Sequence, residues 1–371
     1  MYHSKKIFLT CFTSITLVTY AFHLAKAQPA SSIPSKSMTY SHPNKVNVLV
    51  LTTGGTIAGK ENKQGLDYRA GQTSGEDLVA SVPALKKEAN LTVKAVAQIG
   101  SQDMNDKVIV DLAKEIKKAE SDPKVSGIVI THGTDTMEET AFFLNQVLPH
   151  RKPIVLVGSM RPADAVSADG AGNLLDAVRV AANPEARNRP VMIVMNNDII
   201  SAQFAQKTNS TSVQTFKAPL SGPIGTISNN HVYFFSPPPM ETKAAFAIPS
   251  KIPFPRVDII YSHIQMDSGL IEDSVKRGAR GIILAGVGNG NTSAEAISAL
   301  EKASKKGVIV VRSTRVGNGF VNRNVEVNDD TYNFVVSEYL NPQKSRILLQ
   351  ILLANAVNTT QEIQKQFSKL Y

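Results

Sequence analysis

The sequence contains almost no cysteine: its 371 residues include a single one, Cys11. This cysteine lies inside an N-terminal stretch with the pattern of an export signal, too early to be the lipidated cysteine of a lipoprotein cleavage point. We therefore expect a mature chain with no cysteine, which excludes disulfides, thiolate catalysis and cysteine metal ligands. A chain of this length can rely on its hydrophobic core instead.

Long apolar runs are also scarce. Two lysines precede an apolar stretch from about Ile7 to Leu24, and Ala25–Ala27 fits an A-x-A cleavage site. The stretch is short, contains Thr and Ser, and is followed by no stop-transfer pattern. This favours a cleaved signal peptide at residues 1–27 over a membrane anchor, and predicts a periplasmic or secreted protein without stable membrane insertion. Residues 28–44, rich in Ser, Pro and Ala, predict a disordered leader.

No basic block is interleaved with aromatic residues, although the formal net charge is +9. Cleavage of the signal would remove three lysines and no acid, which leaves a charge of about +6. The remaining basic residues are scattered through predicted helices, for example at Lys117 and Lys118. They are typical of solvated helix faces, so we predict no nucleic-acid partner.

Several other signatures are missing. A G-x-G-x-x-G motif and a GK[ST] ending are absent, which argues against a nucleotide site. The seven histidines are scattered without an H-x-x-x-H pair, so no metal site is predicted. No repeat of 20 to 50 residues is evident.

What the sequence does contain is an alternation of short β-branched runs with helical periodicity, which predicts an α/β fold with a mostly parallel sheet. The expected strands of the first part are Val46–Leu51, Gly127–Thr131, Pro153–Val157 and Val191–Met195. The expected helices include one capped by Asn105 or Asp106, then Asp135–Leu148 and Ala168–Ala182.

The alternation is interrupted and then resumes, which predicts two domains. Residues 45–236 form the larger, catalytic N-terminal domain, and its last part, from residue 200, is polar and rich in turns. The proline-rich residues 237–256 are interpreted as a linker, and residues 257–371 as a smaller C-terminal α/β domain.

Two short stretches stand out because each follows an apolar strand and ends in a small, hydroxyl-bearing turn. They are Thr52–Gly59 (TTGGTIAG) and Ile130–Thr140 (ITHGTDTMEET). Open α/β sheets place their chemistry at such strand ends. Thr56 after the two glycines could act as a nucleophile, and a lysine held by a carboxylate could activate a threonine. His132 has no Ser/His/Asp spacing around it and is interpreted as a packed structural residue.

These stretches also carry a resemblance. The chain from Asn47 to Tyr371 resembles the bacterial-type L-asparaginases, specifically the secreted type II branch with its glutaminase-asparaginase relatives. The specific motifs, besides the two stretches above, are GSQDM from Gly100, SADG from Ser167, KTN from Lys207, GVGNGN from Gly286 and LNPQK from Leu340.

The resemblance implies roles for individual residues. Thr56 corresponds to the nucleophile, with Tyr68 on the following loop close to it. Thr134, Asp135 and Lys207 correspond to a relay of hydroxyl, carboxylate and amine, and Asp135 also binds the substrate's ammonium group. The substrate-binding residues of the same chain correspond to Ser101 and Gln102.

The resemblance further implies that Asn291 and Glu326 reach the site from the C-terminal domain of a neighbouring subunit. The family's assembly is a homotetramer built from two such pairs. The implied reaction is hydrolysis of L-asparagine through a β-aspartyl ester on Thr56, with no cofactor and no metal. The base that activates Thr56 stays open between the Tyr68/Glu326 pair and Lys207.

Substrate choice is less specific than the reaction. The stretch from Gly100 to Asp106 and the asparagine at 291 resemble those of asparagine-preferring family members, while one methylene in a pocket changes affinity by only about 1–3 kcal/mol. We therefore expect secondary activity on L-glutamine. The alternatives are a broad-specificity glutaminase-asparaginase and, from another class, a periplasmic amino-acid binding protein that needs no nucleophile.

Overall fold

The computed structural model describes residues 45–61, 68–69, 73–238 and 244–369. Its larger sheet has the strand order β12-β11-β8-β7-β6-β5-β1-β4. Strands β4, β1, β5, β6 and β7 run parallel, while β8, β11 and β12 are added antiparallel. The bounds are β1 Asn47–Gly54, β4 Asn90–Ile99, β5 Gly127–Thr131, β6 Ile154–Val157, β7 Met192–Met195, β8 Asp198–Ser201, β11 Gly225–Ser228 and β12 His231–Phe234.

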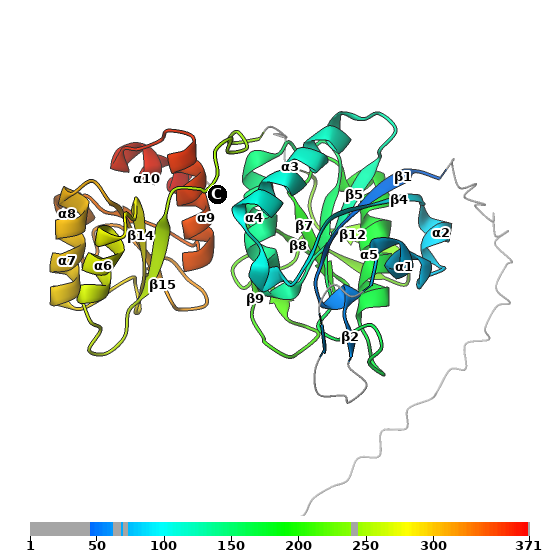
Figure 1. Ribbon diagram of the computed structural model, residues 1–371, viewed down its shortest axis with the longest axis horizontal. Helices are drawn as coiled ribbons and strands as arrows, with labels where there is room; N and C mark the ends of the chain where they lie inside the picture. Colours follow the sequence, from blue (N-terminus) through cyan, green and yellow to red (C-terminus); the bar gives the residue numbers. More distant parts are fainter. Residues whose placement is uncertain (1–44, 62–67, 70–72, 239–243, 370–371) are drawn as a thin grey trace, which may run out of the picture. The chain divides into compact units, whose positions relative to one another are not determined.

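Alternating side chains of the parallel strands pack on opposite faces of this sheet, because successive residues of a strand point to opposite sides. Ile128 and Ile130 of β5 pack with helices α3 and α4, while Val129 between them packs with α5. Figure 1 shows α3 and α4 together beside the sheet. The helices of this part are α1 Gly75–Ala80, α2 Leu85–Glu88, α3 Asp106–Ser121, α4 Met137–Val147 and α5 Gly170–Ala182.

A second sheet, in the C-terminal part, is parallel throughout, with the order β13-β14-β15-β16. Its strands are β13 Val257–Tyr261, β14 Gly281–Gly286, β15 Ile309–Thr314 and β16 Val335–Val336. Its helices are α6 Gly269–Lys276, α7 Ala294–Lys305, α8 Asp329–Tyr332, α9 Pro342–Ala354 and α10 Thr360–Ser368. The two sheets confirm the predicted α/β class with a larger, mostly parallel N-terminal sheet and a smaller C-terminal one.

Two strand pairs lie outside these sheets, β2 Lys60–Glu61 with β3 Tyr68–Arg69 and β9 Gln206–Lys207 with β10 Phe216–Lys217. Both are antiparallel. The second pair is relevant to the site because it carries Lys207.

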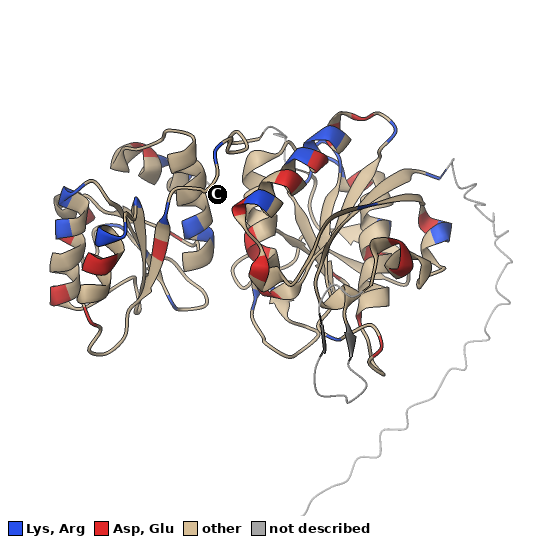
Figure 2. Ribbon diagram, in the orientation of Figure 1, with Lys and Arg blue, Asp and Glu red and all other residues tan. Residues whose placement is uncertain are grey.

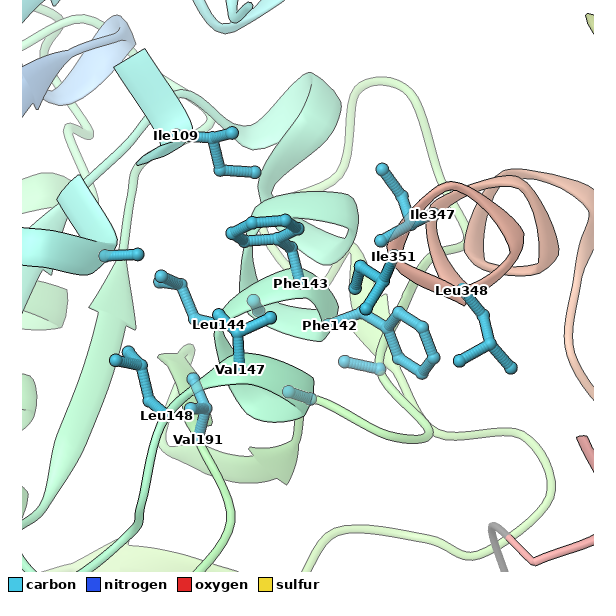
Figure 3. Close-up of a cluster of buried hydrophobic side chains, with 14 of the residues drawn as sticks. Ile109, Phe142, Phe143, Leu144, Val147, Leu148, Val191, Ile347, Leu348 and Ile351 are labelled. Carbon is cyan, nitrogen blue, oxygen red and sulfur yellow. The ribbon is translucent and has the colours of Figure 1, made fainter. Parts of the chain in front are cut away.

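Helices α4 and α9 share one apolar cluster. Phe142 and Phe143 of α4 are fully buried, as are Leu348 and Ile351 of α9. Figure 3 shows the ring of Phe142 directed toward these α9 side chains, while Phe143 lies on the side of Ile109. Burying a large apolar side chain contributes about 1.5–3 kcal/mol, so this cluster fixes α4, whose first residues border the site described below.

The charged side chains lie mainly on helices and loops, and on α3 acidic and basic residues alternate (Figure 2). Lys118 of α3 pairs with Glu115 at 2.7 Å, and Lys107 with Asp111 at 2.6 Å. The scattered lysines of α3 are thus solvated and partly paired, as the sequence indicated.

Two expected helices need correction, and one strand was missed. The helix predicted from Asp135 begins at Met137, because Thr134–Thr136 form a 3₁₀ turn, and the helix predicted from Ala168 begins at Gly170. Strand β4 was not predicted. Its alternating polar residues include Lys94, whose ammonium pairs with Glu115 of α3 at 2.5 Å.

Candidate active site

Three loops meet at one edge of the larger sheet. They follow β1, β4 and β5, which are neighbours in the strand order and parallel, so their carboxyl ends lie together. The loops begin after Gly54, Ile99 and Thr131. Ligand sites of open α/β sheets form at such strand ends.

The loops touch through backbone atoms. Gly55 has a φ of +83°, and a Cβ built on it would lie 2.3 Å from the backbone nitrogen of Gly133. A Cβ on Gly133 would in turn lie 2.7 Å from the hydroxyl of Ser101. Glycine is required at both positions, and it brings the first and third loops into direct contact.

Thr56 follows this contact directly. It opens the 3₁₀ turn Thr56–Ala58 and is 8% exposed, so its side chain lies at the junction of the loops and not on the outer surface. The backbone N–H of Gly59 donates to the Thr56 carbonyl at 2.8 Å and closes the turn. The structure thus holds Thr56 on a fixed backbone beside the other two loops.

Lys207 joins the third loop from a distant part of the sequence. Its Nζ donates to Thr134 Oγ1 at 2.9 Å and to Asp135 Oδ1 at 2.6 Å. The Asp135 side chain is 61% exposed, that of Lys207 is 17% exposed, and Thr134 is buried. The Lys207 ammonium thus links an exposed carboxylate to a buried hydroxyl.

The second loop is fastened to the third. The backbone N–H of Asp135 donates to Ser101 Oγ at 3.2 Å, and Thr136 Oγ1 donates to the Ser101 carbonyl at 2.7 Å. Gln102 is exposed, and its amide folds over Gly100, where a Cβ would lie 2.5 Å from Oε1. The structure therefore places Ser101 beside Thr134 and Asp135.

His132 is packed beneath this assembly. It is fully buried, its Nδ1 lies 2.7 Å from the carbonyl of Gly133 and its Nε2 lies 3.0 Å from Thr140 Oγ1. Burial lowers the pKa of His132 from 6.5 to about 4, so its imidazole is neutral at neutral pH. This agrees with the interpretation of a structural histidine.

Glu138 is a site residue that the sequence did not single out. Its buried carboxylate accepts from the backbone N–H of Lys207 at 2.9 Å. Its other oxygen accepts from Asn341 Nδ2 at 3.3 Å and from the side-chain amide of Gln343. The only available signal was the joint presence of two motifs, one containing Glu138 and one running from Leu340 to Lys344.

Two of the predicted ligands lie in the C-terminal part and are close to each other. Asn291 follows β14, Glu326 follows β15, and the Asn291 amide donates to the Glu326 carboxylate. Glu326 is exposed, and Asn291 Oδ1 is buried without a hydrogen-bond partner among the described residues. The side chain of Tyr68 lies outside the described residues.

Neither a metal cluster nor a membrane helix stands out in the part of the chain that the structure describes. No group of three or more His, Cys, Asp or Glu side chains within it has metal-binding geometry. No helix within it combines the length and the apolarity that a membrane span requires.

Comparison with known proteins gives the family. Residues 47–240 match the family model "Asparaginase, N-terminal", and residues 256–367 match "Glutaminase/Asparaginase C-terminal domain". The chain belongs to the asparaginase family. The recognition made from its motifs is thereby confirmed.

Curated relatives of this asparaginase-family chain cover most of its length. "Probable L-asparaginase periplasmic" of Haemophilus influenzae is 46% identical over 83% of this chain and 88% of that protein. "L-asparaginase 2" of Escherichia coli is 42% identical over 87% of this chain and 93% of that protein. "Glutaminase-asparaginase" of Pseudomonas fluorescens is 40% identical, with 86% and 90% covered.

A solved structure has the same fold. The crystal structure of a probable cytoplasmic L-asparaginase from Campylobacter jejuni superposes with a TM-score of 0.83 at 39% identity, covering 88% of this chain and all of that one. Relatives thus bear both "periplasmic" and "cytoplasmic" in their names. Family membership makes this chain an amidohydrolase.

Proposed function

We propose that this chain hydrolyses L-asparagine to L-aspartate and ammonia, with L-glutamine as a slower substrate. The observation that carries the proposal is the position of Lys207 Nζ between Thr134 Oγ1 and Asp135 Oδ1. The loop that carries Thr134 and Asp135 is in backbone contact with the turn that holds Thr56. A nucleophile and a proton relay are thereby fixed beside each other, as covalent catalysis requires.

The reaction proceeds through an ester. Thr56 Oγ bonds to the side-chain amide carbon, the C–N bond breaks, and the nitrogen leaves as ammonia with the hydroxyl's proton. Water then attacks the β-aspartyl ester, aspartate leaves, and Thr56 regains its proton. Backbone N–H groups near Thr134 stabilise the oxyanion. These steps use no cofactor and no metal.

The proposed ligands suit an amino acid that carries both an ammonium and a carboxylate group. The exposed carboxylate of Asp135 attracts the substrate's ammonium group, together with Glu326. Ser101 and Gln102 bind its α-carboxylate and α-amino groups from the same chain. The family resemblance implies that Tyr68 lies close to Thr56, and either the Tyr68/Glu326 pair or Lys207 accepts the proton of Thr56.

Ammonia release tests this function. Purified wild-type protein is expected to release ammonia from L-asparagine, and Thr56→Ala is expected to release at least a hundredfold less. No release by the wild type, or an undiminished rate for the variant, would refute the proposal. Tight binding of L-asparagine without turnover would instead indicate the amino-acid binding protein.

A second candidate is a broad-specificity glutaminase-asparaginase, favoured by the 40% identity to the Pseudomonas fluorescens protein of that name. The kcat/KM values for the two amides decide between the candidates. Comparable values select the broad-specificity enzyme, and a clear preference for L-asparagine selects the first proposal.

We infer further that the site is shared between subunits of a homotetramer, with Asn291 and Glu326 coming from a neighbouring copy. Exposed apolar side chains occur in the same segment of the chain as Glu326, at Val316, Phe320 and Val325, which suits an interface. Coexpression of a Thr56→Ala chain with a Glu326→Gln chain tests this. If sites are shared, one site of a mixed pair combines the intact Thr56 of the Glu326→Gln chain with the intact Glu326 of the Thr56→Ala chain, and activity returns. If sites are not shared, every site lacks one of the two residues and activity does not return.

The location and the domain limits are also proposed. We propose export with cleavage after about residue 27, followed by a leader to residue 44, and a periplasmic or secreted mature protein. The proposed domains are residues 45–236 and 257–371, joined by the linker 237–256. Mass spectrometry of the protein recovered from the periplasm or medium gives the mature N-terminus and tests the cleavage.

A further inference from the structure

Arg312 of β15 and Asp329 at the start of α8 form a fully buried ion pair. Their side chains are 1% and 0% exposed. The pair is bidentate: Arg312 Nε donates to Asp329 Oδ1 at 2.6 Å, and an Nη donates to Oδ2 at 2.8 Å. Burying two charges is unfavourable unless every donor has an acceptor. The remaining acceptors of the guanidinium therefore show which parts of the structure the ion pair holds in place.

Those remaining partners are backbone carbonyls of two loops. One Nη of Arg312 donates to the carbonyls of Asn289 at 3.2 Å and Gly290 at 3.1 Å, in the loop after β14. The other donates to the carbonyl of Asn322 at 3.2 Å, in the loop after β15. All five donors of the guanidinium are thus used, and three of them hold loop backbone.

Further bonds tie the same two loops together. Asp329 Oδ2 also accepts from the backbone N–H of Asn324 at 2.8 Å. The side chain of Asn289 accepts from the backbone N–H of Asn322 at 2.8 Å, which links one loop directly to the other. The loops are therefore fixed by polar contacts to one buried centre and to each other.

The residues that follow these anchors are the two predicted substrate ligands of the C-terminal part. Asn291 comes directly after Gly290, and Glu326 comes two residues after Asn324. The amide of Asn291 donates to the carboxylate of Glu326, so the two side chains converge although they lie 35 residues apart. A purely apolar core at Arg312 would leave three loop carbonyls without their donor.

We propose that Arg312, held by Asp329, is a positioning residue that sets Asn291 and Glu326 in the geometry needed to bind the substrate. This inference rests on the proposed function, because it takes Asn291 and Glu326 as substrate ligands. Arg312 acts through the two loops and touches no substrate atom.

Arg312→Lys tests the inference, since lysine lacks the planar fork that reaches Asp329 and both loops at once. We expect KM for L-asparagine to rise about tenfold or more, with a smaller loss in kcat, because Glu326 is displaced but still present while the Thr56 loop stays intact. Binding of L-aspartate, measured by calorimetry, is expected to weaken by a similar factor.

Arg189→Lys is the matched control. Arg189 is also buried and also holds backbone carbonyls, those of Glu185 and Ser236, but it precedes β7, at the opposite end of the parallel strands from the site. This variant is expected to lose thermal stability with KM unchanged. An equal rise of KM in both variants would overturn the inference, since the effect would then follow stability alone.

Asn289→Ala decides the matter if Arg312→Lys does not fold. It removes only the side-chain link to Asn322 and leaves the buried pair intact, and we expect KM to rise several-fold with kcat retained. If the wild type is active and Asn291→Ala raises KM, while the loop variants leave KM and L-aspartate binding within twofold, the inference fails and the proposed function stands. An inactive wild type overturns both.

Discussion

Glu138 accepts a hydrogen bond from the backbone N–H of Lys207 at 2.9 Å. Its other carboxylate oxygen accepts from side-chain amides of Asn341 and Gln343, at the start of α9. One buried carboxylate therefore holds the segment that delivers the Lys207 ammonium to Thr134, and anchors that segment to a helix more than a hundred residues away. The proposed relay therefore depends on Glu138, which is not one of its three members.

The first prediction concerns this carboxylate. In Glu138→Gln one acceptor becomes a donor, so either the Lys207 N–H or the α9 amides face an N–H group, an unsatisfied contact that costs about 1–3 kcal/mol. We expect kcat to fall about tenfold through displacement of Lys207. Steady-state kinetics with thermal unfolding of the same sample measure both effects.

Glu139→Gln is its control. Glu139 lies next along α4, and burial raises the pKa of its carboxyl group, so the same substitution is made at a neighbouring carboxyl that is not the acceptor of the Lys207 N–H. It is expected to keep kcat. If Glu138→Gln loses stability and keeps kcat as well, Glu138 only anchors α9.

The second prediction separates proton relay from substrate binding. Thr134→Val removes the hydroxyl that accepts from Lys207 and is expected to lower kcat about 10²–10⁴-fold with little change in KM. Thr136→Val removes the bond to the Ser101 carbonyl and is expected to act mainly on KM. Kinetic constants for both variants check this, and identical effects on kcat would contradict the separate roles.

The third prediction concerns the contact between Gly55 and Gly133. Gly55→Ala would place a Cβ 2.3 Å from a backbone nitrogen at a φ of +83°, so we expect activity to be lost through separation of the loops. Gly172→Ala, in the exposed part of α5 with open space around it, is expected to stabilise the protein by up to about 1 kcal/mol. Activity assays and unfolding midpoints test the pair, and an active Gly55→Ala would show that the loops need not touch.

The fourth prediction is a pH dependence of stability from His132. Its folded pKa, about 4, lies below its ordinary value of 6.5, so the unfolded chain binds the proton first as the pH falls. Stability should therefore drop as the pH falls from 6.5 toward 4, by about 2 kcal/mol at about pH 5 from this group.

Unfolding of His132→Gln at about pH 7.5 and about pH 5 measures this contribution. The variant is expected to show a smaller stability difference between the two pH values than the wild type, because its amide does not titrate. Replacing the exposed His231 by Gln provides a matched substitution at a surface site. A wild-type difference retained in His132→Gln would assign the effect to other groups.

The helices and strands that the sequence predicted are those whose apolar residues recur at a regular helix or strand spacing. The buried strands β5 and β6, and the amphipathic helix α3 with its Asn105 cap, follow from apolar spacing and capping chemistry. Strand β4 was missed because it lies at the edge of the sheet, where polar residues such as Lys94 alternate with apolar ones and find partners on α3. That partnership is tertiary and leaves no local signal.

The site residues also differ in whether a local sequence pattern reveals them. Thr56 and Thr134 stand on strand ends that the local pattern reveals, whereas Lys207 lies on a two-residue strand and was indicated only by the family motif. Glu138 and Arg312 were not identified, because their partners are loop backbone and distant amides. Reactive side chains are therefore easier to predict from a sequence than the side chains that hold them in place.

The backbone contact at Gly55 also bears on how this enzyme could acquire a new substrate. The reach from Thr56 to its relay is set by two main chains in contact, so side-chain replacements elsewhere do not lengthen it. A longer or shorter amide would then have to be accommodated by the proposed substrate ligands, which are Ser101 and Gln102 and, if the site is shared as we propose, Asn291 and Glu326 of a neighbouring copy. Substitutions at the substrate ligands can therefore change the substrate preference while the geometry of the chemical step stays the same.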